Sequence, residues 1–235
     1  MTTRIVCHRG ACRHAPENTI ASGLTAARLG GDIVELDVRQ SRDGVLYVLH
    51  DATVDRTTNG AGAIAEMHSA ELDRLDAGAW FGPEFSGEPL ARLGAFFAAL
   101  KDRTGFYVEV KVADADKVAD AIRRAGIGDR CFTYSETADM RDAMRAAAPW
   151  LKRMVNWRDL RAIADAHDRG AAILEFHAPD FTAGRLAEAR AEGLEIMVHT
   201  PLEDRAVFRA ALAAGVEYLN IDYPDIAAQL RSELP

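Results

Sequence analysis

The chain has 235 residues, of which 49% are hydrophobic and 27% charged, and its formal net charge at pH 7 is -8. This length is enough to bury a sizeable core and suits an α/β barrel built as one domain. The acidic balance argues against nucleic acid or an anionic membrane surface as the main partner, because such partners require a basic excess. An anionic small molecule remains compatible, since a few local cations and a metal ion can overcome a modest negative charge.

The sequence contains no stretch of the roughly 18 to 20 apolar residues that a membrane span needs. The apolar run in the N-terminal segment "MTTRIVCHRG" is also too short for a signal peptide. We therefore predict a cytoplasmic protein without stable membrane insertion. The three cysteines, Cys7, Cys12 and Cys131, are few and odd in number, which favours reduced thiols over a disulfide framework.

Short β-branched runs alternate with Ala-rich stretches along the chain, which is typical of a parallel α/β fold. Strands are predicted at 4–8, 32–38, 105–112, 130–135, 151–156, 171–176, 194–200 and 216–222. A first helix is predicted over 18–30, with Asn18 as its N-cap and Gly30 at its end. Further helices are predicted near 89–102, 114–125, 136–147, 157–169, 183–192, 203–214 and 224–232. This alternation predicts a (β/α)₈ TIM barrel, with residues 1–235 as a single domain.

One connection, residues 44–104, is far longer than a normal barrel crossover, and long loops in compact domains are usually functional. It opens with "GVLYVLH", which we expect to extend a strand. Approximately residues 51–104 are predicted to form a small insertion after the second strand, as a lid near the barrel mouth. Trp80, Phe81 and Phe85 in this insertion either pack the lid or contact an alcohol group or lipid tail.

Two strands carry pairs of charged residues spaced two apart: Glu35 with Asp37, and Glu109 with Lys111. Residues two apart on a strand share a face, so all four side chains should converge inside the barrel. Three carboxylates there would repel one another and lose solvation unless compensated. A hard divalent cation, Mg²⁺ or Ca²⁺, is the economical solution. The alternative is a metal-free ion-pair network around Lys111, although one lysine cannot neutralise three carboxylates.

Two histidines stand where they can face the same centre. His8 ends the first strand, and His50 ends "GVLYVLH" just beyond the second. One imidazole can accept a proton from a nucleophile while the other donates to a leaving oxygen. The metal, Arg9 and Lys111 would stabilise charge on a phosphate. These residues predict a phosphate-diester hydrolase, and a metal-dependent lyase or isomerase stays open.

A set of ordered motifs resembles the glycerophosphodiester phosphodiesterase family over essentially the full chain. The matching pieces are "HRG" (8–10), "PENT" (16–19), "ELDV" (35–38), "DG" (43–44), "HDATVDRTTNG" (50–60), "LDAGAWFGPEFSGEPL" (75–90), "VEVK" (108–111) and "GVEYLNIDYPD" (215–225). Each piece alone is a weak signal. Their combination in this order is highly specific.

The resemblance implies a TIM barrel with a segment inserted after strand two, a divalent metal, and hydrolysis of glycerophosphodiesters to sn-glycerol 3-phosphate and an alcohol. The implied roles are a general acid/base pair, His8 and His50; metal ligands, Glu35, Asp37 and Glu109; and phosphate-binding groups, Arg9 and Lys111. Two points stay open: which histidine is the base, and whether the glycerol 2-hydroxyl or a water attacks phosphorus first.

The chain departs from the family pattern at His199, which stands where many relatives carry a tryptophan. His199 is a candidate substrate- or phosphate-binding residue, and pairing with a nearby carboxylate stays open as its other role. Glu175 and His177 bring further polar groups from the end of the sixth strand. Asp222 is either a helix cap or a partner of the site, and the cap is favoured.

Glu17 and Asn18 are expected to cap the first helix, or else to orient Arg9. His14, His68 and His167 are expected to be solvated surface residues. Two other functions stay open: a phosphodiesterase of the same superfamily for a different headgroup or a lysophospholipid, and a non-catalytic barrel that binds phosphate ligands. The intact set of six acid, histidine and lysine residues argues against the latter. A homo-oligomer also stays open.

Overall fold

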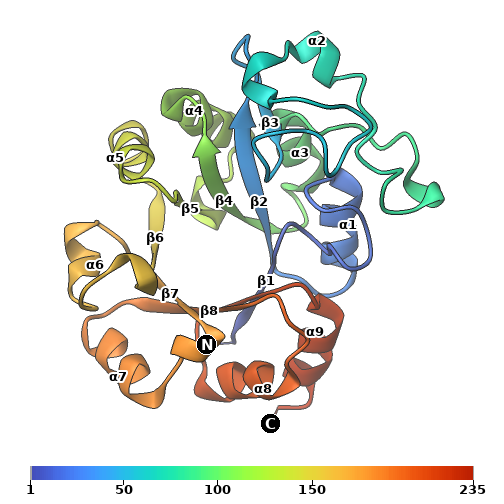
Figure 1. The fold of residues 1–235 in the computed structure, drawn as a ribbon. Helices are drawn as coiled ribbons and strands as arrows, with labels where there is room; N and C mark the ends of the chain where they lie inside the picture. Colours follow the sequence, from blue (N-terminus) through green and yellow to red (C-terminus); the bar gives the residue numbers. More distant parts are fainter. Residues whose placement is uncertain (1, 235) are drawn as a thin grey trace.

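The computed structural model describes residues 2–234, in which eight parallel strands close into a barrel with helices outside it (Figure 1). The barrel closes because the first strand, β1, pairs with both its sequence neighbour β2 and the last strand, β9. The predicted (β/α)₈ fold is confirmed. The barrel strands are β1 (Arg4–Cys7), β2 (Ile33–Gln40), β4 (Gly105–Val112), β5 (Cys131–Tyr134), β6 (Lys152–Asn156), β7 (Ile173–His177), β8 (Glu195–Thr200) and β9 (Tyr218–Ile221).

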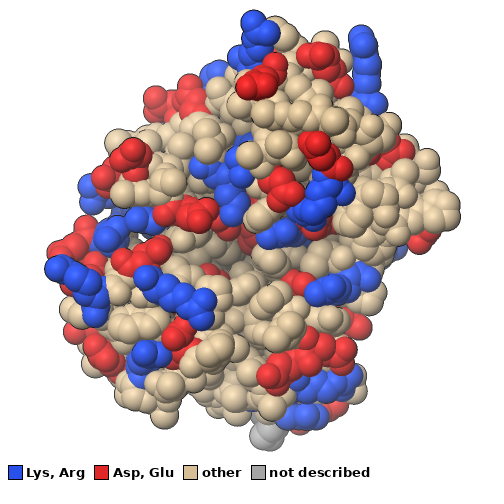
Figure 2. All heavy atoms as spheres, viewed as in Figure 1, with Lys and Arg blue, Asp and Glu red and all other residues tan. Residues whose placement is uncertain are grey.

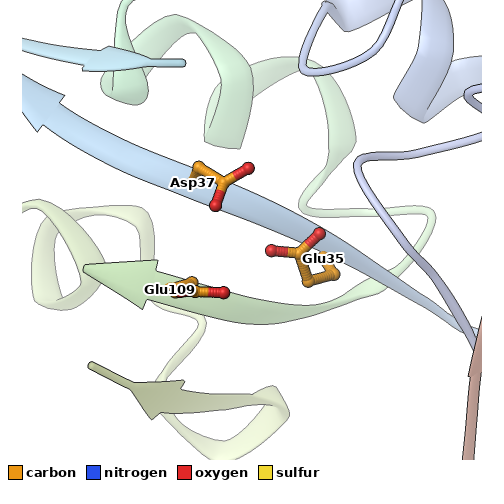
Figure 3. A group of neighbouring side chains, drawn as sticks. All are labelled: Glu35, Asp37 and Glu109. Atoms are coloured by element: carbon orange, nitrogen blue, oxygen red, sulfur yellow. The ribbon is translucent and has the colours of Figure 1, made fainter. Parts of the chain in front are cut away.

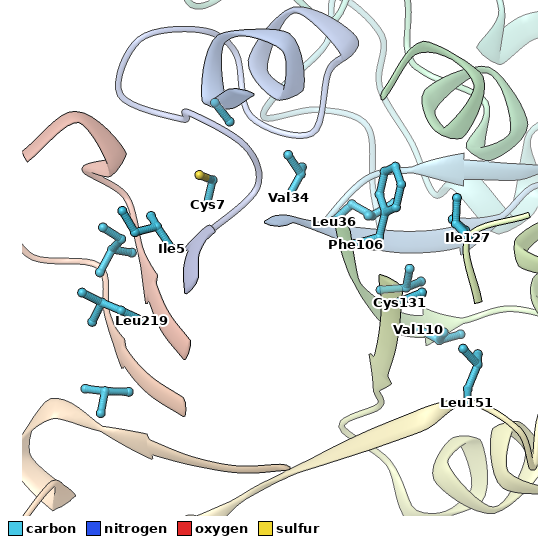
Figure 4. Packing of buried hydrophobic residues seen from close by; sticks show 14 of the residues in the cluster. Ile5, Cys7, Val34, Leu36, Phe106, Val110, Ile127, Cys131, Leu151 and Leu219 are labelled. Carbon is cyan, nitrogen blue, oxygen red and sulfur yellow. The ribbon is translucent and has the colours of Figure 1, made fainter. Parts of the chain in front are cut away.

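Between strands and helices lies the larger apolar core, part of which is drawn in Figure 4. Alternate strand residues such as Leu36 and Val108 point outward into it, against Phe97 and other helix residues. This packing stabilises the fold because it removes apolar surface from water. The helices are α1 (Ile20–Arg28), α3 (Leu93–Leu100), α4 (Ala115–Ala125), α5 (Ala138–Ala147), α6 (Asp165–Asp168), α7 (Ala183–Ala191), α8 (Arg205–Ala214) and α9 (Pro224–Ser232). None of the helices formed by residues 2–234 has the length and apolarity to span a bilayer.

Two local predictions about helices were wrong. The N-cap of α1 is Thr19, whose side chain accepts a hydrogen bond from the Ser22 N–H, because the Asn18 side chain binds elsewhere. The helix predicted over 157–169 is only a 3₁₀ turn, Trp157–Asp159, followed by the one-turn helix α6. The Asp165 carboxylate accepts from two backbone N–H groups, at residues 161 and 162, and so ties them into a local turn.

The insertion begins with β3 (Leu46–Val48), which turns back and pairs antiparallel with the end of β2. The "GVLYVLH" segment therefore forms a separate strand and does not lengthen β2. Short helical turns follow: η1 (Ile64–Glu66), α2 (Ser69–Leu72) and η2 (Pro83–Phe85). They pack around a small apolar core of their own that includes Tyr47 and Leu72. Glu88 fixes this insertion to the barrel by accepting from the Ala21 N–H of α1 at 3.0 Å.

Inside the barrel, each of the eight strands contributes one residue to an apolar layer that fills the interior. The layer consists of Val6, Ile33, Tyr107, Phe132, Met154, Ile173, Met197 and Tyr218. Phe132 stacks on Tyr107 at a centroid distance of 4.8 Å and lies 5.1 Å from Tyr218. We call this layer the apolar floor, because the residues two positions later on each strand face the same interior, nearer the carboxyl ends.

Truncating the floor should weaken the whole fold. Phe132→Ala removes a ring that is 3% exposed and contacts two other rings, so we expect the free energy of unfolding to fall by about 3–5 kcal/mol. Urea denaturation followed by circular dichroism measures the loss. Leu202→Ala, at a side chain 68% exposed, serves as control and should change stability by less than about 0.5 kcal/mol. A loss below about 1 kcal/mol in Phe132→Ala would contradict the role of the floor.

Candidate active site

Directly above the apolar floor, every barrel strand carries a polar residue two positions beyond its floor residue. These side chains line a cavity of about 420 Å³ at the carboxyl ends of the strands. The polar ring consists of His8, Glu35, Glu109, Tyr134, Asn156, Glu175, His199 and Asn220. The position agrees with that of active sites in (β/α)₈ barrels.

The acidic cluster, Glu35, Asp37 and Glu109, lies on β2 and β4 (Figure 3). One carboxylate oxygen from each residue lies within 4.8 Å of the other two. Burial, followed by the charges of Asp37 and Glu109, raises the pKa of Glu35 well above its ordinary value. Burial and Asp37 likewise raise the pKa of Glu109. Burial also acts to raise the pKa of Asp37, but Lys111 and Arg9 outweigh it and hold that pKa below the ordinary value.

Cations and amides around the acidic cluster offset part of this repulsion. The Lys111 Nζ contacts Glu109 and lies 3.4 Å from the Asp37 Oδ1. The backbone N–H of Arg9 donates to the Glu35 Oε2 at 2.7 Å, and the Asn18 Nδ2 donates to the Asp37 Oδ2 at 2.8 Å.

The acidic cluster suits a hard divalent cation. The Glu35 Oε1 is buried and has no hydrogen-bond partner among the described residues. Three carboxylates within ligand distance of one another, with one oxygen uncommitted, are the donor set that Mg²⁺ or Ca²⁺ takes. Lys111 is also in place as the metal-free alternative expects, and the Arg9 Nε lies 3.6 Å from the Asp37 Oδ2, so two cationic side chains face three carboxyl groups.

Each proposed catalytic histidine has its Nδ1 against a carboxylate. The His8 Nδ1 lies 2.9 Å from the Asp222 Oδ1, and the His50 Nδ1 lies 2.6 Å from the Asp51 Oδ1. Both rings line the cavity. Asp222 is therefore a partner of the site, and α9 begins at Pro224 with Tyr223 as an N-cap residue that makes no side-chain capping bond. Because the Nδ1 atoms are engaged, the Nε2 atoms are the ones available to a ligand.

Arg9 is held in place by Glu17, whose Oε1 accepts from the Arg9 Nη1 at 3.0 Å. Glu17 also accepts two hydrogen bonds from Arg56, each of 2.8 Å, and Arg56 continues to Asp51. Glu17 therefore orients the Arg9 side chain, and Glu17 does not cap α1. A further cation that lines the cavity, Arg39, donates to the His50 backbone carbonyl at 2.8 Å. The sequence reasoning missed Arg39, although it stands two residues after Asp37.

Across the barrel from the acidic cluster lies a second set of polar side chains, on β6 to β9. The Glu175 oxygens each lie 3.4 Å from an amide nitrogen, one of Asn156 and one of Asn220. The Asn156 Nδ2 is also 3.0 Å from the His177 Nε2. Burial raises the pKa of Glu175 to about 8. Asn156 and Asn220 were missed from the sequence, and the signal for both was a polar residue two positions after a floor residue.

His199 lies between two other imidazoles. Its ring centroid is 5.1 Å from that of His8 and 5.1 Å from that of His177. Its Nδ1 is buried without a partner among residues 2–234, and no carboxylate within that range pairs with it. Burial, followed by the nearby His8 and His177, lowers the pKa of His199 to about 3, so the ring is neutral at ordinary pH.

The insertion adds a second hollow beside the cavity. Trp80 and Phe81 line it together with His8 and Arg9. Trp80 and Phe85 each pack edge-to-face on Phe81, so the three rings form a small cluster, two of whose members, Trp80 and Phe81, also wall the hollow. Figure 2 shows basic and acidic side chains interspersed over this face of the molecule, not gathered into a field of one sign. His14, His68 and His167 are exposed, as expected.

The fold and the site together define the class of protein. It is a (β/α)₈ barrel whose carboxyl end carries a polar site with clustered carboxyl groups and carboxylate-bound imidazoles, as in barrel enzymes. The model of the Glycerophosphoryl diester phosphodiesterase family matches residues 8–226. The chain belongs to this family. The resemblance found in the sequence motifs is confirmed.

Individual proteins are similar to this chain in structure or in sequence. A crystal structure of a glycerophosphodiester phosphodiesterase from Agrobacterium tumefaciens str. C58 matches with a TM-score of 0.94 and 42% identity, covering 97% of this chain and 99% of that one. A phosphodiesterase of Oleispira antarctica, solved with its product sn-glycerol-3-phosphate, matches with a TM-score of 0.86 and 24% identity, covering 99% and 98%. The glycerophosphodiester phosphodiesterase of Caldanaerobacter subterraneus subsp. tengcongensis is 37% identical over 161 residues, which span 65% of this chain and 65% of that relative's length.

The buried Glu175 should make stability depend on pH. A carboxyl whose folded-state pKa is raised stabilises the fold fully only below its unfolded-state pKa, and this contribution is lost as the pH rises through about 8. Glu175→Gln cannot ionise, so relative to the wild type it should gain more than about 1 kcal/mol of unfolding free energy between about pH 5 and about pH 8.5. Urea denaturation at both pH values measures the gain. Glu188→Gln, on the exposed face of α7, should show none, and an equal absence in Glu175→Gln would contradict the burial argument.

Proposed function

We propose that the protein is a metal-dependent phosphodiester hydrolase that cleaves glycerophosphodiesters to sn-glycerol 3-phosphate and an alcohol. The observation that carries the proposal is the convergence, on one cavity, of the acidic cluster with His8 and His50. Membership of the family and the likeness to the Agrobacterium tumefaciens enzyme support it. We place the reaction in the cytoplasm and take residues 1–235 to act as a single domain.

Glu35, Asp37 and Glu109 would hold one divalent cation, Mg²⁺ or Ca²⁺. When bound, the cation would supply positive charge that stabilises the phosphate oxygens as charge develops on them. Lys111, beside the same carboxylates, and Arg9, braced by Glu17, add fixed positive charge for the phosphate. The guanidinium and ammonium groups would thus bind and orient the diester.

His8 and His50 would carry the protons. A carboxylate at Nδ1 favours the tautomer that has its proton there, which leaves Nε2 free to accept a proton from the attacking hydroxyl. The second imidazole, in its protonated form, gives a proton to the oxygen of the departing alcohol. Asp222 and Asp51 also stabilise the imidazolium that forms on their partners, as the acid of a catalytic triad does.

One observation favours a second candidate substrate within the same reaction class. Trp80 and Phe81 wall a hollow that His8 and Arg9 also line. An apolar wall at that place suits a diester with an apolar substituent, such as a lysophospholipid, because the rings would bury its chain from water. The two candidates differ in the alcohol and share the chemistry at phosphorus.

Removal of the metal should abolish activity. We expect purified protein to release glycerol 3-phosphate from glycerophosphocholine, to lose this turnover after exhaustive chelation, and to recover it with Mg²⁺ or Ca²⁺. Glu109→Gln should lower kcat at least about 10²-fold, because it removes one ligand of the acidic cluster. The exposed Glu188→Gln is the matched control. Turnover that survives chelation would overturn the metal assignment.

Loss of either acid/base histidine should be severe. His8→Ala and His50→Ala are each expected to lower kcat at least about 10²-fold, the lower end for a positioned acid or base. Steady-state kinetics with folded variants, checked by circular dichroism, measures this. His167→Ala changes an exposed imidazole that pairs with Glu192 far from the cavity, and it should keep the wild-type rate. A wild-type rate in His8→Ala or His50→Ala would remove that residue from the mechanism.

A further inference from the structure

A second cavity lies between the strands β5 and β6 and the helices α5 and α6, which follow one another around the outside of the barrel (Figure 1). Its volume is about 230 Å³. The ladder between β5 and β6 ends at Thr133 and Arg153, and the next residues, Tyr134 and Met154, line the cavity. Neither the acidic cluster nor the acid/base histidines line it, so the proposed reaction gives it no role.

This cavity is rich in guanidinium groups. Four arginines line it, from α5, β6 and the end of α6: Arg141, Arg145, Arg153 and Arg169. We therefore call it the arginine cavity. Asp142 and Asp168 are the acidic residues of the lining, which leaves a formal surplus of two positive charges there. The Asp142 carboxylate already pairs with Arg145, at 3.1 Å. An excess of positive charge in a small cavity favours an anionic ligand.

The charge of Arg153 has no carboxylate beside it in the described part of the chain. Its guanidinium donates instead to the backbone carbonyls of Leu151 and Gly170, at 3.2 Å each. Arg145 lies near, since a Cβ built on Gly170 would be 3.2 Å from the Arg153 Nη2 and 3.9 Å from the Arg145 Cδ. Burial, followed by the charge of Arg145, lowers the pKa of Arg153. A bound anion would relieve this repulsion between like charges.

Two donors at the arginine cavity are buried without a hydrogen-bond partner among residues 2–234, the Arg141 Nε and the Ser135 Oγ. Ser135 is 2% exposed. Arg141 is fixed in place, because its Nη1 donates to the carbonyls of Ser135 and Glu136, at 3.1 and 2.7 Å, and lies 3.4 Å from the Asp159 Oδ2. Buried polar atoms are almost always hydrogen-bonded, so a ligand that offers acceptors would complete both donors.

The arrangement of the donors indicates the class of anion. They come from three directions: α5 carries Arg141 and Arg145, β6 carries Arg153, and the loop after β5 carries Ser135. A phosphate group has acceptor oxygens that point in several directions, whereas the two oxygens of a carboxylate lie in one plane. Guanidinium groups also bind phosphate through two parallel hydrogen bonds. The cavity is smaller than the roughly 300–1,000 Å³ of pockets for drug-sized ligands, so the anion should be small.

We propose that the arginine cavity is a second anion site, separate from the catalytic cavity, that binds one small phosphate, either inorganic phosphate or the phosphate group of a monoester. Arg141, Arg145 and Arg153 supply the positive charge, and the Ser135 hydroxyl supplies a neutral donor. None of these residues lines the catalytic cavity. Phosphate bound here is therefore a ligand of the barrel wall and takes no part in the hydrolysis proposed above.

Calorimetric titration of the full-length protein with inorganic phosphate, at constant ionic strength and with chelator present, tests the site. We expect saturable binding that Arg141→Gln weakens at least about 10-fold, because hydrogen bonds to charged groups are the strong ones. Arg145→Gln, at a side chain 49% exposed, should weaken it at least about 3-fold. Ser135→Ala should also weaken it at least about 3-fold, and so small a change keeps the fold if Arg141→Gln proves unstable.

Arg123→Gln is the matched control. Like Arg145, Arg123 lies in the last turn of its helix, α4, is largely exposed, and pairs with an aspartate three residues earlier, Asp120 at 2.6 Å. It does not line the arginine cavity, so its loss should change the affinity for phosphate by less than about 2-fold.

Parallel titrations identify the ligand. Equal affinity for inorganic phosphate and glycerol phosphate would show that the phosphate group alone is recognised, and tighter binding of the ester would show that its organic part contributes. Either result supports the site when Arg145→Gln weakens the binding. Malonate carries two negative charges on planar carboxylates, and an affinity for malonate equal to that for phosphate would overturn the assignment to phosphate.

The inference and the proposed function fail separately. Absence of saturable phosphate binding, or binding that Arg141→Gln, Arg145→Gln and Ser135→Ala all leave unchanged, would overturn the second site while the hydrolase stands. If no diester is hydrolysed, the proposed function fails, yet phosphate binding that these three variants weaken and Arg123→Gln does not would still support the arginine cavity as an anion site.

Discussion

Three carboxyl groups, those of the buried Glu35 and Asp37 and the partly buried Glu109, lie within 4.8 Å of one another, and the surrounding side chains offset their repulsion. Isolated charges at such a place would cost far more than a domain can tolerate, so each has a nearby cation or amide. Lys111 comes from the same strand as Glu109, while Asn18 reaches in from the loop before α1. The compensation is partial, since the pKa of Glu35 stays raised. In the function proposed above, a divalent cation would supply the remaining compensation.

Side chains alternate along a β-strand, so one spacing in the sequence positions every residue of the polar ring. On each strand an apolar floor residue is followed, two positions later, by a polar ring residue, as in Ile33 with Glu35 and Tyr107 with Glu109. The floor excludes water from below and fixes the depth of the cavity. Because parallel strands end at the same edge, eight separate segments deliver their polar residues to one place. A one-residue slip on any strand would exchange a polar side chain for one that packs against the helices.

The sequence predicted the parts of this arrangement that repeat. The eight strands and the pairs two apart on β2 and β4 follow from periodicity and hold in the structure. On the opposite side of the cavity the sequence indicated Glu175, His177 and His199 but not Asn156 and Asn220, because a lone asparagine in an apolar strand looks like a tolerated exception until its neighbours on other strands are known. The helix expected at 157–169 failed for another reason: the Asp165 side chain competes for backbone N–H groups, and helix propensity cannot report this competition. Asp222 was assigned to local capping, whereas its partner His8 lies at the other end of the chain.

Backbone strain at the first loop is tied to the same carboxylates. Arg9 and Asn18 are the non-glycine residues with positive φ within residues 2–234, at 54° and 60°, and Arg9 in particular pays a steric cost of about 1–2 kcal/mol there. Between them Gly10, with φ of 80°, approaches Ser22 so closely that a Cβ would lie 2.2 Å from its Oγ. This conformation aims the Arg9 N–H at Glu35 and brings the Asn18 amide to Asp37. The backbone of Arg9 thereby serves the acidic cluster, and its guanidinium, braced by Glu17, also lies beside that cluster, with Nε 3.6 Å from the Asp37 Oδ2. The hydrogen bonds that the strained loop gives to Glu35 and Asp37 thus offset both the strain of the loop and part of the repulsion in the barrel.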